Sequence, residues 1–178
     1  KKILPQVIMS IPFPKNMRWA YLDIEFARPI HTILALMDHQ VIRFQLGNIT
    51  SSRYTNGHSF MAPAKIKLET NEEYLSKLKS AKVVADIRER RRMLTDDIAG
   101  VARTLNGRIL PDEELLDIVN NLVEYPVAVG GAFEEAFLEV PDEVLINAMR
   151  EHQKYFAVVD SNGKLMPCFI AVNNTLAD

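Results

Sequence analysis

The chain has 178 residues and a net charge of −2, with 48% hydrophobic and 25% charged residues. These values are ordinary for a globular protein with a sizeable core. No apolar run approaches the roughly 18–20 residues of a membrane helix, and the basic first residues lead into no signal peptide. A single cysteine, Cys168, permits no internal disulfide and, in an apolar strand, is expected to be a small buried hydrophobe; this fits a reducing compartment.

The small net charge hides a strong asymmetry along the chain. Residues 1–108 carry 18 Lys and Arg against 10 Asp and Glu, whereas 109–149 carry 10 acids and no base. Residues 150–178 hold three of each sign. The pattern predicts a surface for a polyanion in the first part and a protein contact or solvation in the second. Two solvated faces are the alternative interpretation.

The first 46 residues predict a helix, a cationic loop and a hairpin. Apolar spacing over Ile3–Ile11 indicates a helix that ends before Pro12. In the loop that follows, two cations and Trp19 either face a phosphate or a base, or the indole anchors the core. The nearly continuous apolar run Pro29–Met37 predicts a strand buried on both faces, and 41–46 alternates as its hairpin partner.

Residues 47–85 predict a long polar loop and small elements. The loop spans Gly47–Phe60 and is either functional or mobile. After it we expect a short strand over Lys65–Leu68, a helix over Asn71–Ser80 capped by Thr70 or Asn71, and a brief strand over Lys82–Ala85.

Two amphipathic helices are predicted over 86–124. The longer, Asp86–Leu105, ends at Asn106-Gly107 and carries the densest cation cluster of the chain, 88–92. This cluster either follows a nucleic-acid backbone or is a solvated helix face. The second helix spans Asp112–Glu124, with Leu122 among its inward residues.

The last part predicts strands at Pro126–Val129 and Phe133–Val140, then a helix that leads into a hairpin. Pro141 fits the first position of this helix. The hairpin joins Tyr155–Val159 to Leu165–Val172, with Gly163 in the turn. We find no phosphate loop, no nucleophile elbow and no metal-ligand spacing among the histidines, so the sequence predicts no catalytic or metal residue.

Several short blocks, in order along nearly the whole chain, resemble the beta subunit of bacterial-type glycyl-tRNA synthetase. The blocks are Pro12–Lys15 with Met17–Trp19, Phe26–His31, Gly57-His58 with Phe60, Lys82–Asp86 with Glu89-Arg90, Leu122–Pro126, Phe133–Glu135 with Phe137-Leu138, and His152–Phe156. That family often has Gly-His-Arg-Phe where this chain has Gly57-His58-Ser59-Phe60, so an RNA contact by that arginine is missing or moved here.

The resemblance implies a fold, an activity and partners. It implies an internal portion of a longer beta chain, 1–178 being one domain or part of a body, with a possible helical subdomain at 86–125. The α+β fold would be similar to the tRNA-contacting, editing-like modules of the phenylalanyl-tRNA synthetase beta chain. An alpha subunit would bind ATP, magnesium and glycine and perform the chemistry, in a cytoplasmic assembly of two alpha and two beta chains acting on tRNA(Gly). No cofactor is expected in this chain itself.

Three hypotheses for the role of the chain stay open at this point. The first is a non-catalytic tRNA-binding module; the second is an editing hydrolase for mischarged tRNA, with His58 as its acid or base. The third is a scaffold that holds the alpha subunit. The candidate tRNA-binding residues are Lys15, Arg18, Arg53, His58, Arg88, Arg91, Arg92 and Lys154.

Overall fold

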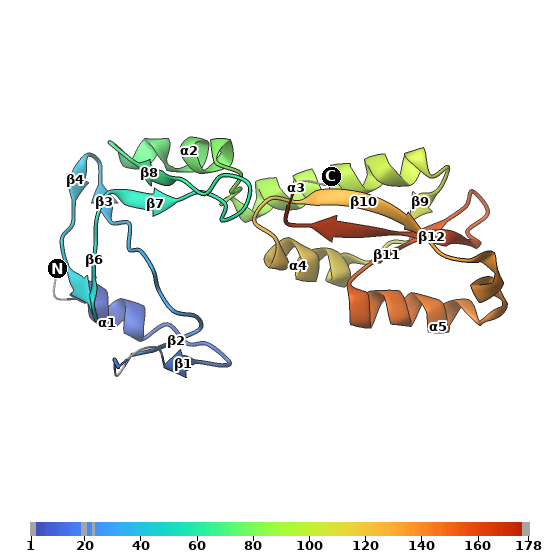
Figure 1. The fold of residues 1–178 in the computed structure, drawn as a ribbon, viewed down its shortest axis with the longest axis horizontal. Coiled ribbons are helices and arrows are strands. Elements are labelled where there is room, and N and C mark those ends of the chain that lie inside the picture. Colours follow the sequence, from blue (N-terminus) through green and yellow to red (C-terminus); the bar gives the residue numbers. More distant parts are fainter. Residues whose placement is uncertain (1–2, 19–20, 23, 176–178) are drawn as a thin grey trace. The chain divides into compact units, whose positions relative to one another are not determined.

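The computed structural model describes residues 3–18, 21–22 and 24–175. The backbone divides into two compact units, residues 1–81 and 82–178 (Figure 1). Both combine helices with small antiparallel sheets, which confirms the predicted mixture of helices and hairpins. The expectation that 1–178 is one domain or part of one stays a prediction, as does the likeness to an editing-like module.

The first unit is built from small hairpins and two helices. Helix α1 spans Ile3–Met9, as predicted, and a 3-10 turn at Asn71–Glu73 leads into helix α2, Tyr74–Ser80. Each of its four sheets has two antiparallel strands. The pairs are β1 Met17–Arg18 with β2 Glu25–Phe26, β3 Leu36–Met37 with β4 Gln40–Val41, β5 Gln45–Leu46 with β6 Ile49–Thr50, and β7 Tyr54–Asn56 with β8 Lys65–Lys67.

Hydrogen bonds from polar side chains hold these hairpins together. The hydroxyl of Ser51, which is fully buried, donates to the carbonyl of Ile42 at 2.7 Å and accepts the N–H of Phe44 at 2.9 Å. Arg53 donates to the carbonyls of His39 at 3.1 Å and Leu68 at 3.4 Å. Because two-residue strands bury little apolar surface, these bonds fix positions that a larger core would otherwise fix.

Two predictions for the first unit are wrong. Only Leu36–Met37 of the run Pro29–Met37 forms a strand, and the run is half-buried or exposed. The prediction of a structureless loop at 47–60 fails as well, because β6 and β7 lie within it. The predicted alternation over 41–46 is confirmed, since Leu46 is buried and Arg43 and Gln45 are exposed.

The second unit contains an antiparallel sheet of four strands in the order β10-β12-β11-β9. Its strands are β9 Arg108–Ile109, β10 Val127–Ala132, β11 Phe156–Val159 and β12 Leu165–Asn173. The predicted final hairpin is confirmed: Gly163 has φ +85° in its turn, and Asp160 accepts the N–H groups of Asn162 and Lys164.

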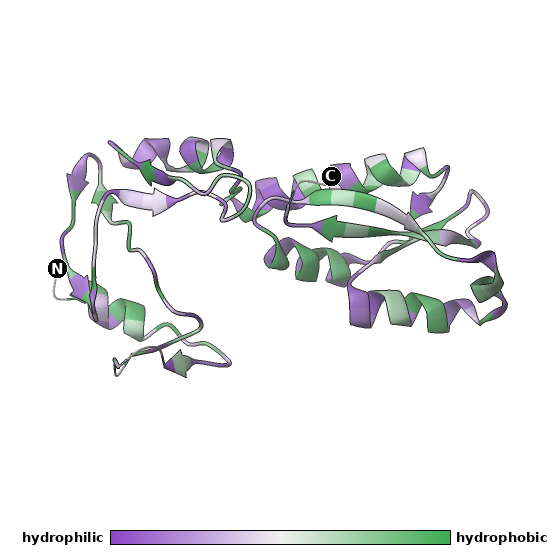
Figure 2. Ribbon diagram, in the orientation of Figure 1, coloured by the Kyte–Doolittle hydropathy of each residue, from purple (hydrophilic) through white to green (hydrophobic). Residues whose placement is uncertain are grey.

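Two helices pack against this sheet and make the core. Helix α3 spans Ile87–Thr104 and helix α4 spans Glu113–Leu122, both as predicted. Figure 2 shows apolar residues along β10 and β12, whereas the first turn of α3 is hydrophilic. The buried cluster is formed by Leu94, Ile98, Ala102, Leu115, Leu116, Val119, Phe156, Val158, Cys168 and Ile170. Cys168 is buried, which confirms it as a core residue. This burial raises the pKa of its thiol.

Helix α5, Asp142–Asn147, begins directly after Pro141, one position later than predicted, and continues as a π-helix over Ala148–Gln153. Lys154 ends it with φ 58°.

Three predictions for the second unit are wrong. Residues 82–85 form no strand, although the Val84 N–H bonds the carbonyl of Glu124. Residues 135–139 form a 3-10 helix in place of a strand, and Leu122 is 63% exposed. The strand predicted at 126–129 is present as part of β10, which continues through two glycines. A glycine is needed at position 131, because a Cβ there would lie 2.4 Å from the Phe169 ring.

Candidate nucleic-acid interface

The start of α3 places a run of five charged residues on its first two turns. Asp86 caps the helix: its Oδ1 accepts the N–H of Arg88 at 2.8 Å and of Glu89 at 3.0 Å. These bonds, first from Glu89 and then from Arg88, lower the pKa of Asp86. The cap therefore fixes the first turn of the helix, on which the arginines of the run begin.

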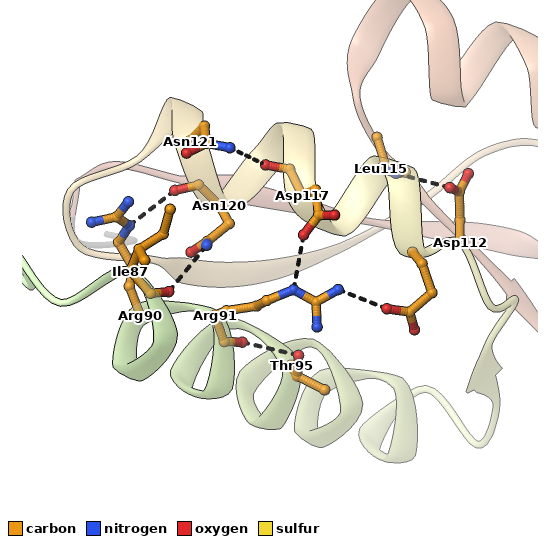
Figure 3. A network of polar contacts seen from close by, with 10 residues as sticks. Ile87, Arg90, Arg91, Thr95, Asp112, Leu115, Asp117, Asn120 and Asn121 are labelled. Atoms are coloured by element: carbon orange, nitrogen blue, oxygen red, sulfur yellow. Dashed lines mark hydrogen bonds and ion pairs between the residues drawn. The ribbon is translucent and has the colours of Figure 1, made fainter.

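Arg90 is used inside the second unit. Its Nε donates to the carbonyl of Asn120 at 2.9 Å and its Nη1 to that of Val84 at 2.7 Å. The Asn120 amide returns a bond of 3.2 Å to the Ile87 carbonyl (Figure 3). Arg90 thus satisfies a carbonyl in the last turn of α4 that has no partner within that helix.

Arg91 is also committed to α4. Its Nη2 lies 2.6 Å from a carboxylate oxygen of Glu113, and its Nε 2.9 Å from Asp117 (Figure 3). The hydrogen bonds that the guanidinium donates to Glu113 and then to Asp117 raise its pKa. Since its charge is already compensated, we assign Arg91 to helix packing and leave it out of the interface.

Arg88 and Arg92 differ from these two arginines. They lie one helical turn apart, both are exposed, and neither forms an ion pair with any residue that the structure describes. With Asp86 and Glu89 they line a shallow hollow of about 350 Å³. A guanidinium presents a planar fork of donors that suits phosphate oxygens, so this pair can bind a polyanion backbone.

The acidic stretch has a role that its charge did not predict. Arg150 pairs with Asp112 at 2.6 Å, with Glu114 and with Glu151. The hydrogen bonds that this guanidinium donates to Asp112 and Glu114 raise its pKa. The expectation that 109–149 faces a partner or solvent is confirmed for Glu113, Glu114 and Asp117, whose side chains are 66–78% exposed although each also pairs with an arginine. Asp112 departs from it, because its side chain is only 24% exposed in its pair with Arg150. These pairs could not be predicted from the sequence, because the partners lie 22–38 residues apart.

The other candidate residues are dispersed, and four of them belong to the first unit. Lys15 is exposed, Arg18 lies 3.4 Å from Glu25, and Arg53 pairs with Glu69 at 2.5 Å. Trp19 lies outside the described residues. In the second unit, Lys154 lies 3.7 Å from Glu151. Of the eight candidates, Arg88, Arg91 and Arg92 are the ones that share an element, helix α3.

His58 is fully buried, and its Nδ1 accepts the N–H groups of Phe60 and Met61, each at 3.2 Å. These contacts make the side chain part of a turn, which is unsuited to a general base that must reach a substrate. Among the described residues, no three His, Cys, Asp or Glu side chains gather as metal ligands. None of the described helices is long and apolar enough to cross a membrane.

The described structure is a mixed α/β arrangement with an exposed arginine pair at the start of a capped helix. Comparison with known proteins identifies its family: a model described as "Glycyl-tRNA synthetase beta subunit" matches residues 1–178, and the chain belongs to that family.

Three curated relatives are each named glycine–tRNA ligase beta subunit. The protein of Desulfatibacillum aliphaticivorans is 57% identical over 175 residues, and that of Desulforapulum autotrophicum 58% over 175. These matches cover 98% of this chain and 25% of each relative. The protein of Geobacter sulfurreducens is 49% identical over 177 residues, 99% of this chain and 26% of the relative. The chain thus spans about a quarter of the length of the curated relatives it matches.

Proposed function

We propose that this chain is a tRNA-binding portion of a glycyl-tRNA synthetase beta subunit. It contacts the RNA backbone through Arg88 and Arg92, while an alpha subunit that binds ATP, magnesium and glycine performs the aminoacylation. The partners are tRNA(Gly), the alpha subunit and a second beta subunit, in a cytoplasmic assembly of two alpha and two beta chains. Family membership supports the part in glycyl-tRNA synthesis.

The observation that carries the RNA contact is the division of labour within residues 88–92. Arg90 and Arg91 are held by α4 and the 84 carbonyl, whereas Arg88 and Arg92 are exposed without an ion-pair partner among the described residues. Arg88 and Arg92 are therefore the members of the cluster whose charge is available to a ligand. Two guanidinium groups one turn apart suit two oxygens of a phosphate backbone.

The test is equilibrium binding of tRNA(Gly) to the assembled enzyme with the full-length beta chain. Arg88→Gln and Arg92→Gln together remove two charges without changing the length of the side chains much. We expect a weaker affinity at low salt, because phosphate contacts supply most of the electrostatic binding. Arg103→Gln, an exposed arginine in the last turn of the same helix, is the matched control and keeps the wild-type affinity.

An affinity unchanged in the double variant would contradict the proposal. Loss of the alpha subunit together with unchanged tRNA affinity would favour the scaffold function instead. The buried, turn-forming His58 favours no hydrolytic function, so editing is not proposed here.

A further inference from the structure

A second hollow lies in the first unit, at the loop that joins β7 to β8. It has a volume of about 450 Å³ and is lined by Asn56, Gly57, Ser59, Pro63, Ala64 and Lys65. The described lining carries one cation and no carboxylate, unlike the hollow beside Arg88 and Arg92, which includes Asp86 and Glu89. Its charge therefore favours an anionic ligand.

The turn that forms one wall of this hollow is fixed by its own hydrogen bonds. The Nδ1 of His58 accepts two successive N–H groups, and the His58 carbonyl accepts the N–H of Ala62 at 3.0 Å. Gly57 permits a close approach: a Cβ there would lie 2.5 Å from the Ala62 carbonyl oxygen and 2.9 Å from the Ala81 Cβ. A turn held in this way presents its outer side chains without a large loss of entropy on binding.

The most prominent of these side chains is Phe60. Its residue is 77% exposed and directly follows Ser59 of the lining. A single exposed apolar residue needs no special explanation. Phe60, however, lies on the fixed turn between two lining residues of the hollow, Ser59 and Pro63, and its ring centre is 6.3 Å from that of His58. Ser59 and Asn56 add a hydroxyl and an amide to the lining.

Lys65 supplies the charge at the same place. Its Nζ lies 4.5 Å from the centre of the Tyr54 ring, which positions the ammonium group. Lys65 is exposed and forms no ion pair within the described part of the chain. An exposed aromatic ring, hydrogen-bonding groups and an uncompensated cation are the elements with which proteins bind single-stranded RNA.

We infer that this hollow receives one unpaired nucleotide of the bound RNA. The base stacks on Phe60 with its polar edge toward Asn56 and Ser59, and the phosphate lies near Lys65. The inference rests on the proposed function, because it names a second contact of the same RNA-facing module. It assigns a role to the block Gly57-His58-Ser59-Phe60, in which Phe60 and not His58 meets the ligand.

The experiment uses the assembled enzyme and tRNA(Gly), with Phe60→Ala, Phe60→Tyr and Lys65→Gln in the full-length beta chain. Loss of one stacked base weakens binding by about 5- to 100-fold, so we expect this of Phe60→Ala. Phe60→Tyr keeps the ring and restores binding. Phe60→Ala leaves the salt dependence unchanged. Lys65→Gln makes the fall of log K with log salt less steep, by about 0.7–0.9.

Phe137→Ala is the control, because Phe137 is another exposed phenylalanine, 51% exposed, in the second unit. Equal tRNA affinity of Phe60→Ala and wild type would overturn the inference, and loss of the alpha subunit from that variant would assign Phe60 to a protein contact. If the Arg88/Arg92 double variant binds weakly while Phe60→Ala does not, only this inference fails. If the reverse holds, the arginine contact fails and the nucleotide site stands.

Discussion

The two units of this chain are held together in different ways. Of the buried apolar residues among those described, three belong to the first unit and fifteen to the second. The second unit closes a continuous core between α3, α4 and a four-stranded sheet. The first unit has two-stranded sheets that are joined by hydrogen bonds between the main chain and the side chains of Ser51, Arg53 and His58. Apolar burial therefore stabilises one unit, and specific polar contacts shape the other.

The largest expected effect follows from a core residue of the second unit. Phe156 is 1% exposed, so Phe156→Ala removes a ring from the centre of the core cluster. We expect a loss of about 3–5 kcal/mol in the free energy of unfolding. Hydrogen exchange resolved along the chain measures it as lost protection over 87–122 and 156–173.

Phe137→Ala is the matched comparison and is expected to cost only about 1 kcal/mol, because its ring is half exposed and packs edge-on against Phe133. A similar small effect at Phe156 would show that the second unit does not depend on its apolar core.

A smaller effect is expected from a polar residue of the first unit. Ser51→Ala leaves the N–H of Phe44 and the carbonyl of Ile42 without the hydroxyl that bonds both. Leaving buried polar groups unsatisfied costs about 1–3 kcal/mol. The measurement is exchange protection over residues 40–55.

Ser76→Ala provides the comparison for Ser51, since its hydroxyl bonds the Glu73 carbonyl at 3.0 Å on an exposed helix face. Water replaces that bond, so we expect no measurable loss. Equal effects of the two substitutions would contradict a special role for buried polar contacts.

The difference between the units also explains which predictions from sequence succeed. In the second unit, local signals mark the helix ends and the final turn: Asp86 and Asp112 cap their helices, Asn106 with φ 61° ends α3, and Gly163 makes its turn. The prediction of a strand over Pro29–Met37 is wrong. Apolar composition does not reveal that Leu34 pairs with Ser52 only through an isolated bridge. Where non-local polar bonds set the pairing, periodicity carries little information.

The candidate site shows the same limit. The sequence identifies 88–92 as a cation cluster, and the helix period places its members on neighbouring faces. Which arginines are available depends on Glu113 and Asp117, 22 and 26 residues further on. Phe60 and Lys65, which we propose as nucleotide contacts, are not among the candidate residues that the sequence predicts. The block Gly57-His58-Ser59-Phe60 contains Phe60, but its histidine is the residue that the sequence predicts as functional.

The smallest expected effect concerns the cap of α3 at low pH. The pKa of Asp86 lies below its ordinary value in the folded chain, mainly through the N–H bonds from Glu89 and Arg88. Its contribution to stability is therefore complete above the unfolded pKa of about 3.9 and is lost as the pH falls through the folded pKa. Asp86→Asn retains a capping oxygen but no titrating group.

Urea unfolding at pH 6 and pH 3 measures this difference. We expect the free energy of unfolding to fall less between the two values in Asp86→Asn than in the wild type. Equal decreases would show that the carboxylate charge does not contribute to the cap.

The most direct test of the account is the salt dependence of tRNA(Gly) binding to the assembled enzyme, comparing Arg88→Gln/Arg92→Gln with Arg91→Gln. Log K falls as log salt rises, and each lost phosphate contact reduces the steepness of this fall by about 0.7–0.9. We predict a decrease of about 1.4–1.8 for the double variant and none for Arg91→Gln, whose charge Glu113 and Asp117 already compensate. A decrease for Arg91→Gln with an unchanged slope in the double variant would contradict the account.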